Sequence, residues 1–294
     1  MIFLFGLLLV FLFAGYYFAL QVIHPKVLSV EETYRTEIAC GRMNETEFTG
    51  WESRPIWLKS PFGYSLYGLY LPVTGSQKTI IIAHGITYSL YGSVKYVNLF
   101  RKRGFNVLLY DHRNHGRSGG LWSTFGHYEK HDLGVFFAWA QNQLVDGGQV
   151  AVMGESFGAA VAVQFAAIQP KVAFLVLDCC FSDLIDLLAY RLKVDFYLPP
   201  WPLLPLVSFF SRLLTGMSFG EICPRREMLK ITCPVFFAHG QNDVFTPCRM
   251  SQELYEAAQS PHKIIYLAPN AGHAEAFWNN QKEYDRQVGE FLKK

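Results

Sequence analysis

The sequence predicts an α/β fold, in which a mostly parallel sheet of eight strands is flanked by helices and a helical lid is inserted late in the chain. Three observations lead to this prediction. Short apolar segments alternate with helical segments, the sequence Gly154-Glu155-Ser156-Phe157-Gly158 joins a buried strand to a helix of small residues, and the alternation stops once, in an apolar, proline-rich stretch. Alternating strands and helices form a parallel sheet covered on both faces, with functional residues at its carboxyl edge.

The composition fits one large domain and excludes some classes of function. The chain has 294 residues, of which 51% are hydrophobic, and this is enough for a sizeable core. Its net charge is only +2 and no run of Lys or Arg forms a basic stripe, so we expect no nucleic-acid partner. The six cysteines are too dilute for a disulfide scaffold and form no Cys-x-x-Cys, which mildly favours a reducing compartment.

The amino-terminal segment is apolar and long enough to cross a membrane. No Asp, Glu, Lys or Arg precedes Lys26, and a helix of about 20 residues spans a bilayer core of roughly 30 Å. Because no basic residue and no clear small-x-small site mark a signal peptide, we expect residues 1–26 to be an uncleaved transmembrane anchor. A cleaved signal peptide and a buried helix are the alternatives. The segment is followed by basic residues, Lys26, Arg35 and Arg42, and is preceded by none. Because basic residues favour the cytoplasmic side of a membrane, this weakly places the domain formed by residues 27–294 in the cytoplasm.

The elements after Pro55 follow one another in a regular order. Strands are expected at 56–59, 65–73, 78–83, 106–110, 149–153, 172–177, 234–239 and 263–267. Helices are expected at 93–102, 127–145, 159–167, 247–258 and 279–292. The first two strands are joined through Pro61-Phe62-Gly63 and are expected to pair antiparallel. Residues 182–231 contain no buried strand and several prolines among Leu, Phe, Tyr and Trp, so we expect a lid of short helices there.

The sequence around Ser156 has the pattern of a nucleophile elbow. In a Gly-x-Ser-x-Gly between strand and helix, the serine sits at a strained turn with its hydroxyl held above the carboxyl edge of the sheet. Gly154 and Gly158 have no Cβ, which lets the strand and the helix approach each other. An ordinary strand-turn-helix corner is the alternative interpretation, but the flanking pattern favours the elbow.

A serine nucleophile needs a base and a carboxylate that holds the base, and the chain offers both in the required order. A serine hydroxyl is a poor nucleophile at neutral pH, and in this architecture the acid and then the histidine follow the serine along the chain. Asp243 follows one expected strand and His273 follows the next, so both fall at the same edge as Ser156. We predict that these three residues form a catalytic triad. Asp178, at another strand end, is the alternative acid.

Hydrolysis also needs donors for an oxyanion, each worth about 3 kcal/mol of barrier. We expect these donors to be the backbone N–H groups of Phe157, which follows the serine, and of Ile86, in the loop after strand 78–83. His84 in the same loop is expected to bond loop backbone rather than to transfer protons.

These residues also carry a resemblance to a known family. Ser156, Asp243 and His273, together with His84-Gly85 and loop 111–120, resemble the α/β-hydrolase superfamily from about Glu52 to the end of the chain. The Asp-x-Arg-x-His-Gly-x-Ser form of the loop is similar to the branch of serine aminopeptidases and monoacylglycerol lipases. The anchor is similar to that of membrane-bound members. The resemblance implies the α/β-hydrolase fold with this triad, and does not define a substrate.

The same resemblance bears on the polar residues of loop 111–120. Asp111, His112 and His115 could be considered metal ligands, but the comparison implies a structural role, with Asp111 and Arg113 bonding local backbone. We therefore expect neither a metal nor another cofactor. The loop after His84-Gly85 departs from lipases that carry His-Gly-Gly-Gly, and their substrate range does not transfer.

Together these features predict a membrane-anchored serine hydrolase that cleaves acyl esters or thioesters through an acyl-enzyme on Ser156. The apolar lid favours lipid-like or medium-chain acyl substrates, because each buried methylene contributes about 0.8 kcal/mol; an esterase for small esters is the plainer alternative. A peptidase of the serine-aminopeptidase type would need an acidic group for the substrate amine. The lid offers Asp183, Asp186, Asp195 and Glu221. A non-catalytic interaction module on a hydrolase scaffold is the remaining alternative.

Overall fold

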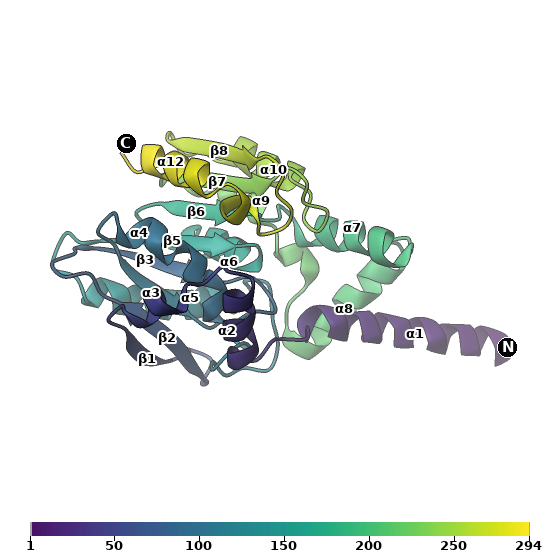
Figure 1. Ribbon diagram of the computed structural model, residues 1–294. Helices are drawn as coiled ribbons and strands as arrows, with labels where there is room; N and C mark the ends of the chain where they lie inside the picture. The colour runs from purple at the N-terminus through teal and green to yellow at the C-terminus, as the bar shows by residue number, and fades with distance from the viewer. Residues whose placement is uncertain (1, 294) are drawn as a thin grey trace.

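An eight-stranded sheet in the order β1-β2-β4-β3-β5-β6-β7-β8 forms the centre of the domain (Figure 1). The computed structural model describes residues 2–293. The strands are β1 (Arg54–Lys59), β2 (Ser65–Leu71), β3 (Lys78–Ala83), β4 (Asn106–Tyr110), β5 (Gln149–Glu155), β6 (Leu175–Asp178), β7 (Val235–Gly240) and β8 (Lys263–Ala268). β2 pairs antiparallel with β1 and β4, and all other pairs are parallel. The predicted fold class is confirmed.

The strand bounds follow the sequence pattern closely, except that β6 begins at Leu175 rather than at 172. β3 and β4 begin and end where the apolar runs predicted, and every residue of β4 is buried. β2 ends at Leu71 rather than at 73, because Pro72 has no N–H with which to continue the ladder.

The helices differ more from the prediction at their ends. They are α1 (Ile2–Ile23), α2 (Val30–Ala39), α3 (Glu45–Thr49), α4 (Val97–Arg101), α5 (Glu129–Asn142), α6 (Phe157–Ala166), α7 (Leu184–Phe196), α8 (Leu203–Thr215), α9 (Pro224–Met228), α10 (Arg249–Ala257), α11 (Ala276–Asn279) and α12 (Gln281–Phe291). The helix expected at 93–102 begins as a 3-10 helix, η1 (Leu90–Tyr96), before α4. A second 3-10 helix, η2 (Phe219–Glu221), precedes α9. α2 was not predicted, although Ser29 and Glu32 form a capping box at its start.

Helices cover both faces of the sheet and create two hydrophobic cores. Alternate residues of β3 point to opposite sides: Ile81 joins the core under α5 and α6, whereas Ile80 and Ile82 join the core under α4 and α12. This alternation is the period-two geometry of a strand, and it explains why β3 is apolar along its length.

The two glycines of the elbow are required by close backbone contacts. A Cβ on Gly158 would lie 2.2 Å from the carbonyl oxygen of Ala83, and one on Gly154 would lie 2.3 Å from the carbonyl oxygen of Gly158. Between them, Ser156 has φ 53° and ψ −114°, which is strained for a residue with a side chain. This strained turn between β5 and α6 has the backbone geometry expected of the elbow rather than of an ordinary corner, and it places Ser156 at the carboxyl end of β5.

The segment between β6 and β7 folds into short helices, two of which pack against the amino-terminal helix. α8 packs against the carboxyl-terminal half of α1 (Figure 1), and a Cβ on Gly15 of α1 would lie only 2.4 Å from Cγ of Leu206 of α8. Edge-to-face ring pairs join Tyr16 to Phe210 and Phe18 to Phe196. α1 and the α7–α8 pair therefore form one packed unit.

Replacing Gly158 by alanine tests the glycine requirement. Because the new methyl group would meet the backbone of β3, we expect Gly158→Ala to lose about 3 kcal/mol or more of unfolding free energy, measured by urea denaturation. The control is Gly134→Ala in α5, where the Cβ would lie an ordinary 3.5 Å from Phe165 and alanine suits a helix better than glycine. Equal stability of the two variants would contradict the requirement.

Candidate active site

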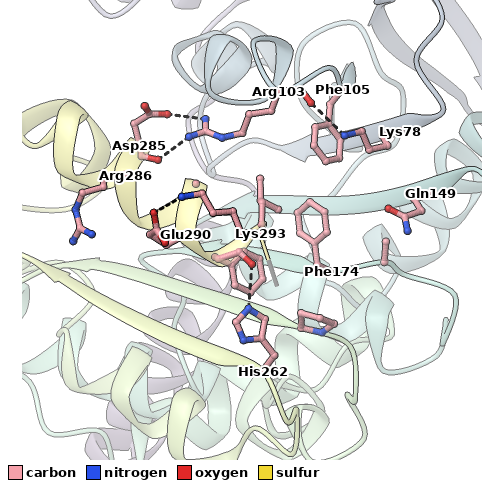
Figure 2. Close-up of a pocket in the computed structure, with 15 residues that line it drawn as sticks. Lys78, Arg103, Phe105, Gln149, Phe174, His262, Asp285, Arg286, Glu290 and Lys293 are labelled. Atoms are coloured by element: carbon pink, nitrogen blue, oxygen red, sulfur yellow. Dashed lines mark hydrogen bonds and ion pairs between the residues drawn. The ribbon is translucent and has the colours of Figure 1, made fainter.

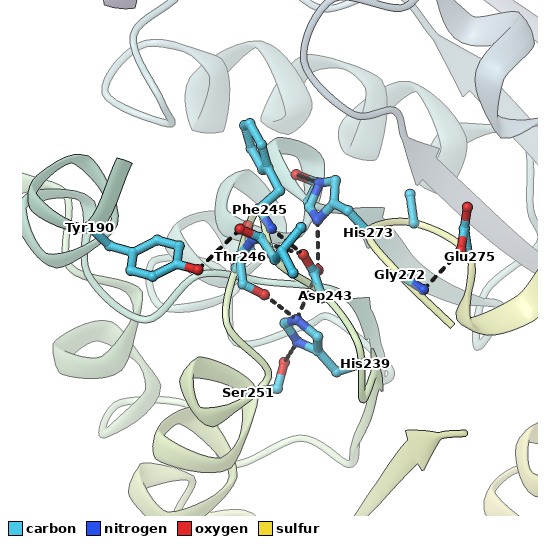
Figure 3. A network of polar contacts seen from close by, with 12 residues as sticks. Tyr190, His239, Asp243, Phe245, Thr246, Ser251, Gly272, His273 and Glu275 are labelled. Carbon is cyan, nitrogen blue, oxygen red and sulfur yellow. Dashed lines mark hydrogen bonds and ion pairs between the residues drawn. The ribbon is translucent and has the colours of Figure 1, made fainter. Parts of the chain in front are cut away.

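Ser156, His273 and Asp243 come together at the carboxyl edge of the sheet. Ser156 directly follows β5, His273 lies in the loop after β8, and Asp243 lies in the loop after β7. Nε2 of His273 lies 2.9 Å from Oγ of Ser156. Nδ1 of His273 lies 2.7 Å from Oδ2 of Asp243 (Figure 3). A carboxylate only accepts, so Nδ1 carries the proton toward Asp243 and Nε2 is free to accept from the serine hydroxyl. The arrangement can pass a proton from Ser156 to His273.

The Asp243 carboxylate is held by donors on both of its oxygens. Oδ1 accepts from the backbone N–H groups of Phe245 and Thr246, each at 2.8 Å. Oδ2 accepts from His273 and also lies 3.1 Å from Nε2 of His239. Burial opposes ionisation, but the hydrogen bonds from the two histidines hold the pKa of Asp243 well below its ordinary value. The group is therefore a carboxylate at neutral pH.

His239, a fully buried residue that the sequence reasoning did not single out, supports this carboxylate. Its Nε2 lies 2.8 Å from the carbonyl oxygen of Thr246, and its Nδ1 lies 2.6 Å from Oγ of Ser251 (Figure 3). Because the carbonyl only accepts, Nε2 carries a proton that it shares between Thr246 and Asp243. Its place near the end of an apolar strand, four residues before Asp243, was a signal that could have found it.

Asp178, the alternative acid, has different partners. Its Oδ2 accepts from the hydroxyl group of Tyr284 at 3.0 Å and lies 3.2 Å from the hydroxyl oxygen of Tyr96, and the residue is fully buried. Burial and the neighbouring charge of Glu155 raise the pKa of Asp178 to about 6. The hydrogen bond to His273 is made by Asp243, so the geometry favours Asp243 as the acid.

A buried lysine, also missed from the sequence, connects two segments of the site. Nζ of Lys95 lies 2.5 Å from Oε2 of Glu155, which precedes Ser156. The same ammonium group donates to the carbonyl oxygen of Ala274, which follows His273, at 3.3 Å. Lys95 thus ties the strand that carries the serine to the loop that carries the histidine.

The two backbone amides expected to stabilise an oxyanion lie in segments beside Ser156. Phe157 begins α6 directly after the serine, and a Cβ on Gly85, next to Ile86, would lie 3.9 Å from Cβ of Ser156. Among residues 2–293, neither amide donates a hydrogen bond to another group of the protein. Both N–H groups are therefore available to a ligand.

His84 has the structural role that was predicted. Its Nδ1 donates to the carbonyl oxygen of Gly85 at 2.7 Å, and its Nε2 accepts from the N–H of His112 at 3.1 Å. Burial lowers the pKa of His84 to about 3, so the ring is neutral. His112 and His115 pack their rings near Phe157 at 4.7 and 5.9 Å between centroids, and this fixes the loop beside the elbow.

The role expected for Asp111 is confirmed, whereas the role expected for Arg113 is not. Asp111 accepts from the backbone N–H groups of Leu90 and Arg117, as predicted. The expectation for Arg113 was wrong, because its guanidinium lies over the rings of Tyr64 and Tyr128, 5.1 and 4.5 Å from their centroids. Cation–π contacts with two aromatic faces have replaced the expected backbone hydrogen bonds.

A cavity lies at the amino-terminal edge of the parallel strands, opposite the edge that carries Ser156. It has a volume of about 680 Å³ and includes Lys78 and Gln149, the first residues of β3 and β5 (Figure 2). Arg103 in this cavity is paired with Asp285 at 2.7 Å. The parallel strands begin at this edge and the candidate catalytic groups lie where they end, so the cavity is separate from the site.

Comparisons with known proteins agree with the architecture of the sheet and its helices. A family model described as the alpha/beta hydrolase fold matches residues 78–200. The chain is 35% identical over 280 residues to the uncharacterized protein YqkD of Bacillus subtilis, covering 95% of this chain and 92% of that protein. An uncharacterized protein of Mycobacterium tuberculosis is 30% identical and covers 75% of this chain and 72% of its own. A solved esterase of Pyrococcus furiosus superposes with a TM-score of 0.70 at 28% identity, covering 85% of this chain and 94% of the esterase.

The raised pKa of Asp178 predicts a pH-dependent stability. Between about pH 4 and 6 the folded protein binds a proton at Asp178 that the unfolded chain has lost, so this residue lowers stability as pH rises. A rise of the Asp178 pKa from its ordinary value to about 6 corresponds to roughly 3 kcal/mol of stability. Asp178→Asn removes this dependence.

We therefore expect Asp178→Asn to gain stability relative to the unmodified protein between pH 4 and pH 7.5, measured by urea denaturation. Asp146→Asn, at an exposed position, controls for the lost negative charge. A stability difference that stays constant with pH would contradict the assignment.

Proposed function

Because the chain belongs to the α/β-hydrolase family, we propose that this hydrolase is a serine hydrolase that cleaves acyl esters or thioesters through an acyl-enzyme on Ser156. The observation that carries the proposal is the unbroken line of hydrogen bonds from Asp243 through His273 to Ser156. A serine hydroxyl needs such a partner pair to attack a carbonyl at neutral pH.

In the proposed reaction, Nε2 of His273 takes the proton of Ser156 as Oγ attacks the acyl carbonyl. Asp243 stabilises the resulting imidazolium, and the N–H groups of Phe157 and Ile86 bind the oxyanion. His273 then gives the proton to the departing alkoxide or thiolate. Water, activated by the same histidine, releases the acid and restores Ser156. His239 keeps the Asp243 carboxylate aligned throughout.

The surroundings of the site favour an acyl substrate over a peptide amine. Phe157 belongs to one hydrophobic cluster with Leu184 and Leu187 of the lid segment. Three of the four lid carboxylates that could hold a substrate amine have other partners. Asp183 caps α7, Asp195 pairs with Arg191, and Glu221 lies 3.4 Å from Nδ1 of His127. The structurally similar protein of Pyrococcus furiosus is an esterase, and this likeness supports the same reaction class.

Replacing the serine tests the proposal directly. We expect Ser156→Ala to lower kcat/KM for a p-nitrophenyl ester by about 1,000-fold or more and to abolish labelling by a fluorophosphonate probe, because the attacking oxygen is gone. Ser53→Ala, at an exposed position, is the matched control. Full labelling of Ser156→Ala would remove the serine from its proposed role.

We also propose that α1 is an uncleaved membrane anchor with the hydrolase domain in the cytoplasm. Residues 3–23 have a mean hydropathy of 2.3. Side chains such as Phe3, Val10 and Phe13 are more than 60% exposed, as lipid contact requires. A signal sequence has the same length and composition, so the mature protein must be examined.

Mass spectrometry of the purified protein should find residues 1–23 retained. The protein should stay in the membrane fraction after carbonate washing. On intact cells, an impermeant maleimide should leave the exposed Cys40 unlabelled until lysis, with Cys40→Ser as the control for labelling at other thiols. A mature chain that lacks α1 would contradict the anchor, and labelling of Cys40 on intact cells would contradict the orientation.

A further inference from the structure

A narrow apolar cleft lies between the amino-terminal helix and the lid. It has a volume of about 140 Å³ and is lined mainly by Phe18 and Val22 of α1, Leu188 and Leu192 of α7, and Leu204 and Val207 of α8. We propose that this cleft binds the end of the substrate's acyl chain, so that α1 is a wall of the substrate site as well as an anchor. This inference rests on the proposed serine hydrolase function.

The cleft is connected to the candidate catalytic groups through two side chains. Arg191 lines the cleft, donates to the carbonyl oxygen of Val244 at 2.9 Å, and places its guanidinium 4.5 Å from the ring centroid of Phe245. The ring of Phe245 lies 4.8 Å from the ring of His273. Tyr190 reaches the same loop (Figure 3) through a hydrogen bond to Val244.

Apolar packing is also continuous between the cleft and the elbow. Leu192, Leu204 and Val207 belong to the same hydrophobic cluster as Phe157, whose N–H is a proposed oxyanion donor, and Ile86 packs against that cluster. The proposed acyl chain starts at a carbonyl bound beside Ser156 and follows this apolar packing toward α1. Each methylene group of the chain that moves from water to these apolar side chains lowers the free energy of binding.

The size and charge of the cleft also fit an acyl chain. An apolar protein cavity of about 150 Å³ is large enough to hold benzene, so 140 Å³ accommodates several terminal carbons. The charge of Arg191 is already used, because its Nε lies 2.9 Å from a carboxylate oxygen of Asp195. The cleft thus offers hydrophobic contact and no unpaired cation for a polar ligand.

Filling the cleft tests the proposal in the full-length protein. Leu188→Trp on α7 and Val22→Trp on α1 place indole rings at two half-buried lining positions. The measured quantity is the ratio of kcat/KM for a decanoyl ester to kcat/KM for an acetyl ester. We expect each variant to lower this ratio about tenfold or more, since a few methylene groups lose their site.

Two matched controls carry the same tryptophan outside the cleft. Leu213→Trp on α8 and Val10→Trp on α1 lie at positions that are 69% and 67% exposed, and we expect the wild-type ratio from both. Fluorophosphonate labelling reports whether each variant retains a folded site. An unchanged ratio in both cleft variants, or an equal fall in the controls, overturns the proposal. A fall in Leu188→Trp alone removes α1 from the site and overturns it as well.

The wild-type protein and Ser156→Ala, assayed with the same two esters, separate this inference from the proposed function. If acetyl ester hydrolysis does not depend on Ser156, the serine hydrolase itself is wrong. If acetyl ester hydrolysis does depend on Ser156 but the decanoyl-to-acetyl ratio is unchanged in the cleft variants, only the acyl-chain site is wrong.

Discussion

The close crossing of β3, β5 and α6 is the constraint on which the site depends. Ser156 keeps a positive φ only because the backbones around it meet without intervening Cβ atoms, and such strain costs of order 1–3 kcal/mol. The surrounding structure offsets that cost, since every residue of α6 is buried and β5 is buried after its first residue. The same crossing brings the Gly85 loop beside the serine, so the proposed nucleophile and both proposed oxyanion donors are positioned by one packing arrangement.

Behind the serine, buried charges hold the loops in register. Lys95 faces Glu155 at 2.5 Å, and the hydroxyl of Tyr96 donates to the same carboxylate at 2.6 Å. Burial raises the pKa of the nearby Glu37 on α2. Glu37 is therefore less inclined to add a second negative charge beside Glu155. Removing one partner of a buried ion pair leaves an uncompensated charge and costs about 3–5 kcal/mol. The network therefore fixes the end of β5 relative to the His273 loop.

The sequence predicted what depends on local pattern and missed what depends on long-range contacts. β3 and β4 were found to the residue, because runs buried on both faces leave a plain apolar signature. Ser156, His273 and Asp243 could be proposed because their order and strand-end positions follow from topology. Lys95 could not, since it looks like an isolated polar residue until Ala274, 179 positions further along the chain, is packed against it. Arg113 was misjudged for the same reason: its aromatic partners are 49 and 15 positions away along the sequence.

The amino-terminal helix is both the proposed membrane anchor and a proposed wall of the substrate site. Gly15 lets Leu206 approach α1 closely, and ring pairs extend the contact toward Phe196 at the end of α7. Beyond that contact, the α7–α8 tip exposes Tyr197 and Trp201, residue types that favour the boundary between lipid and water. A helix that inserts in a bilayer would thus bring the lid to the membrane surface with it. Substrate chains leaving the lipid would meet apolar side chains of α1 and the lid before they reach the serine, and exposed apolar surface would serve both attachment and entry.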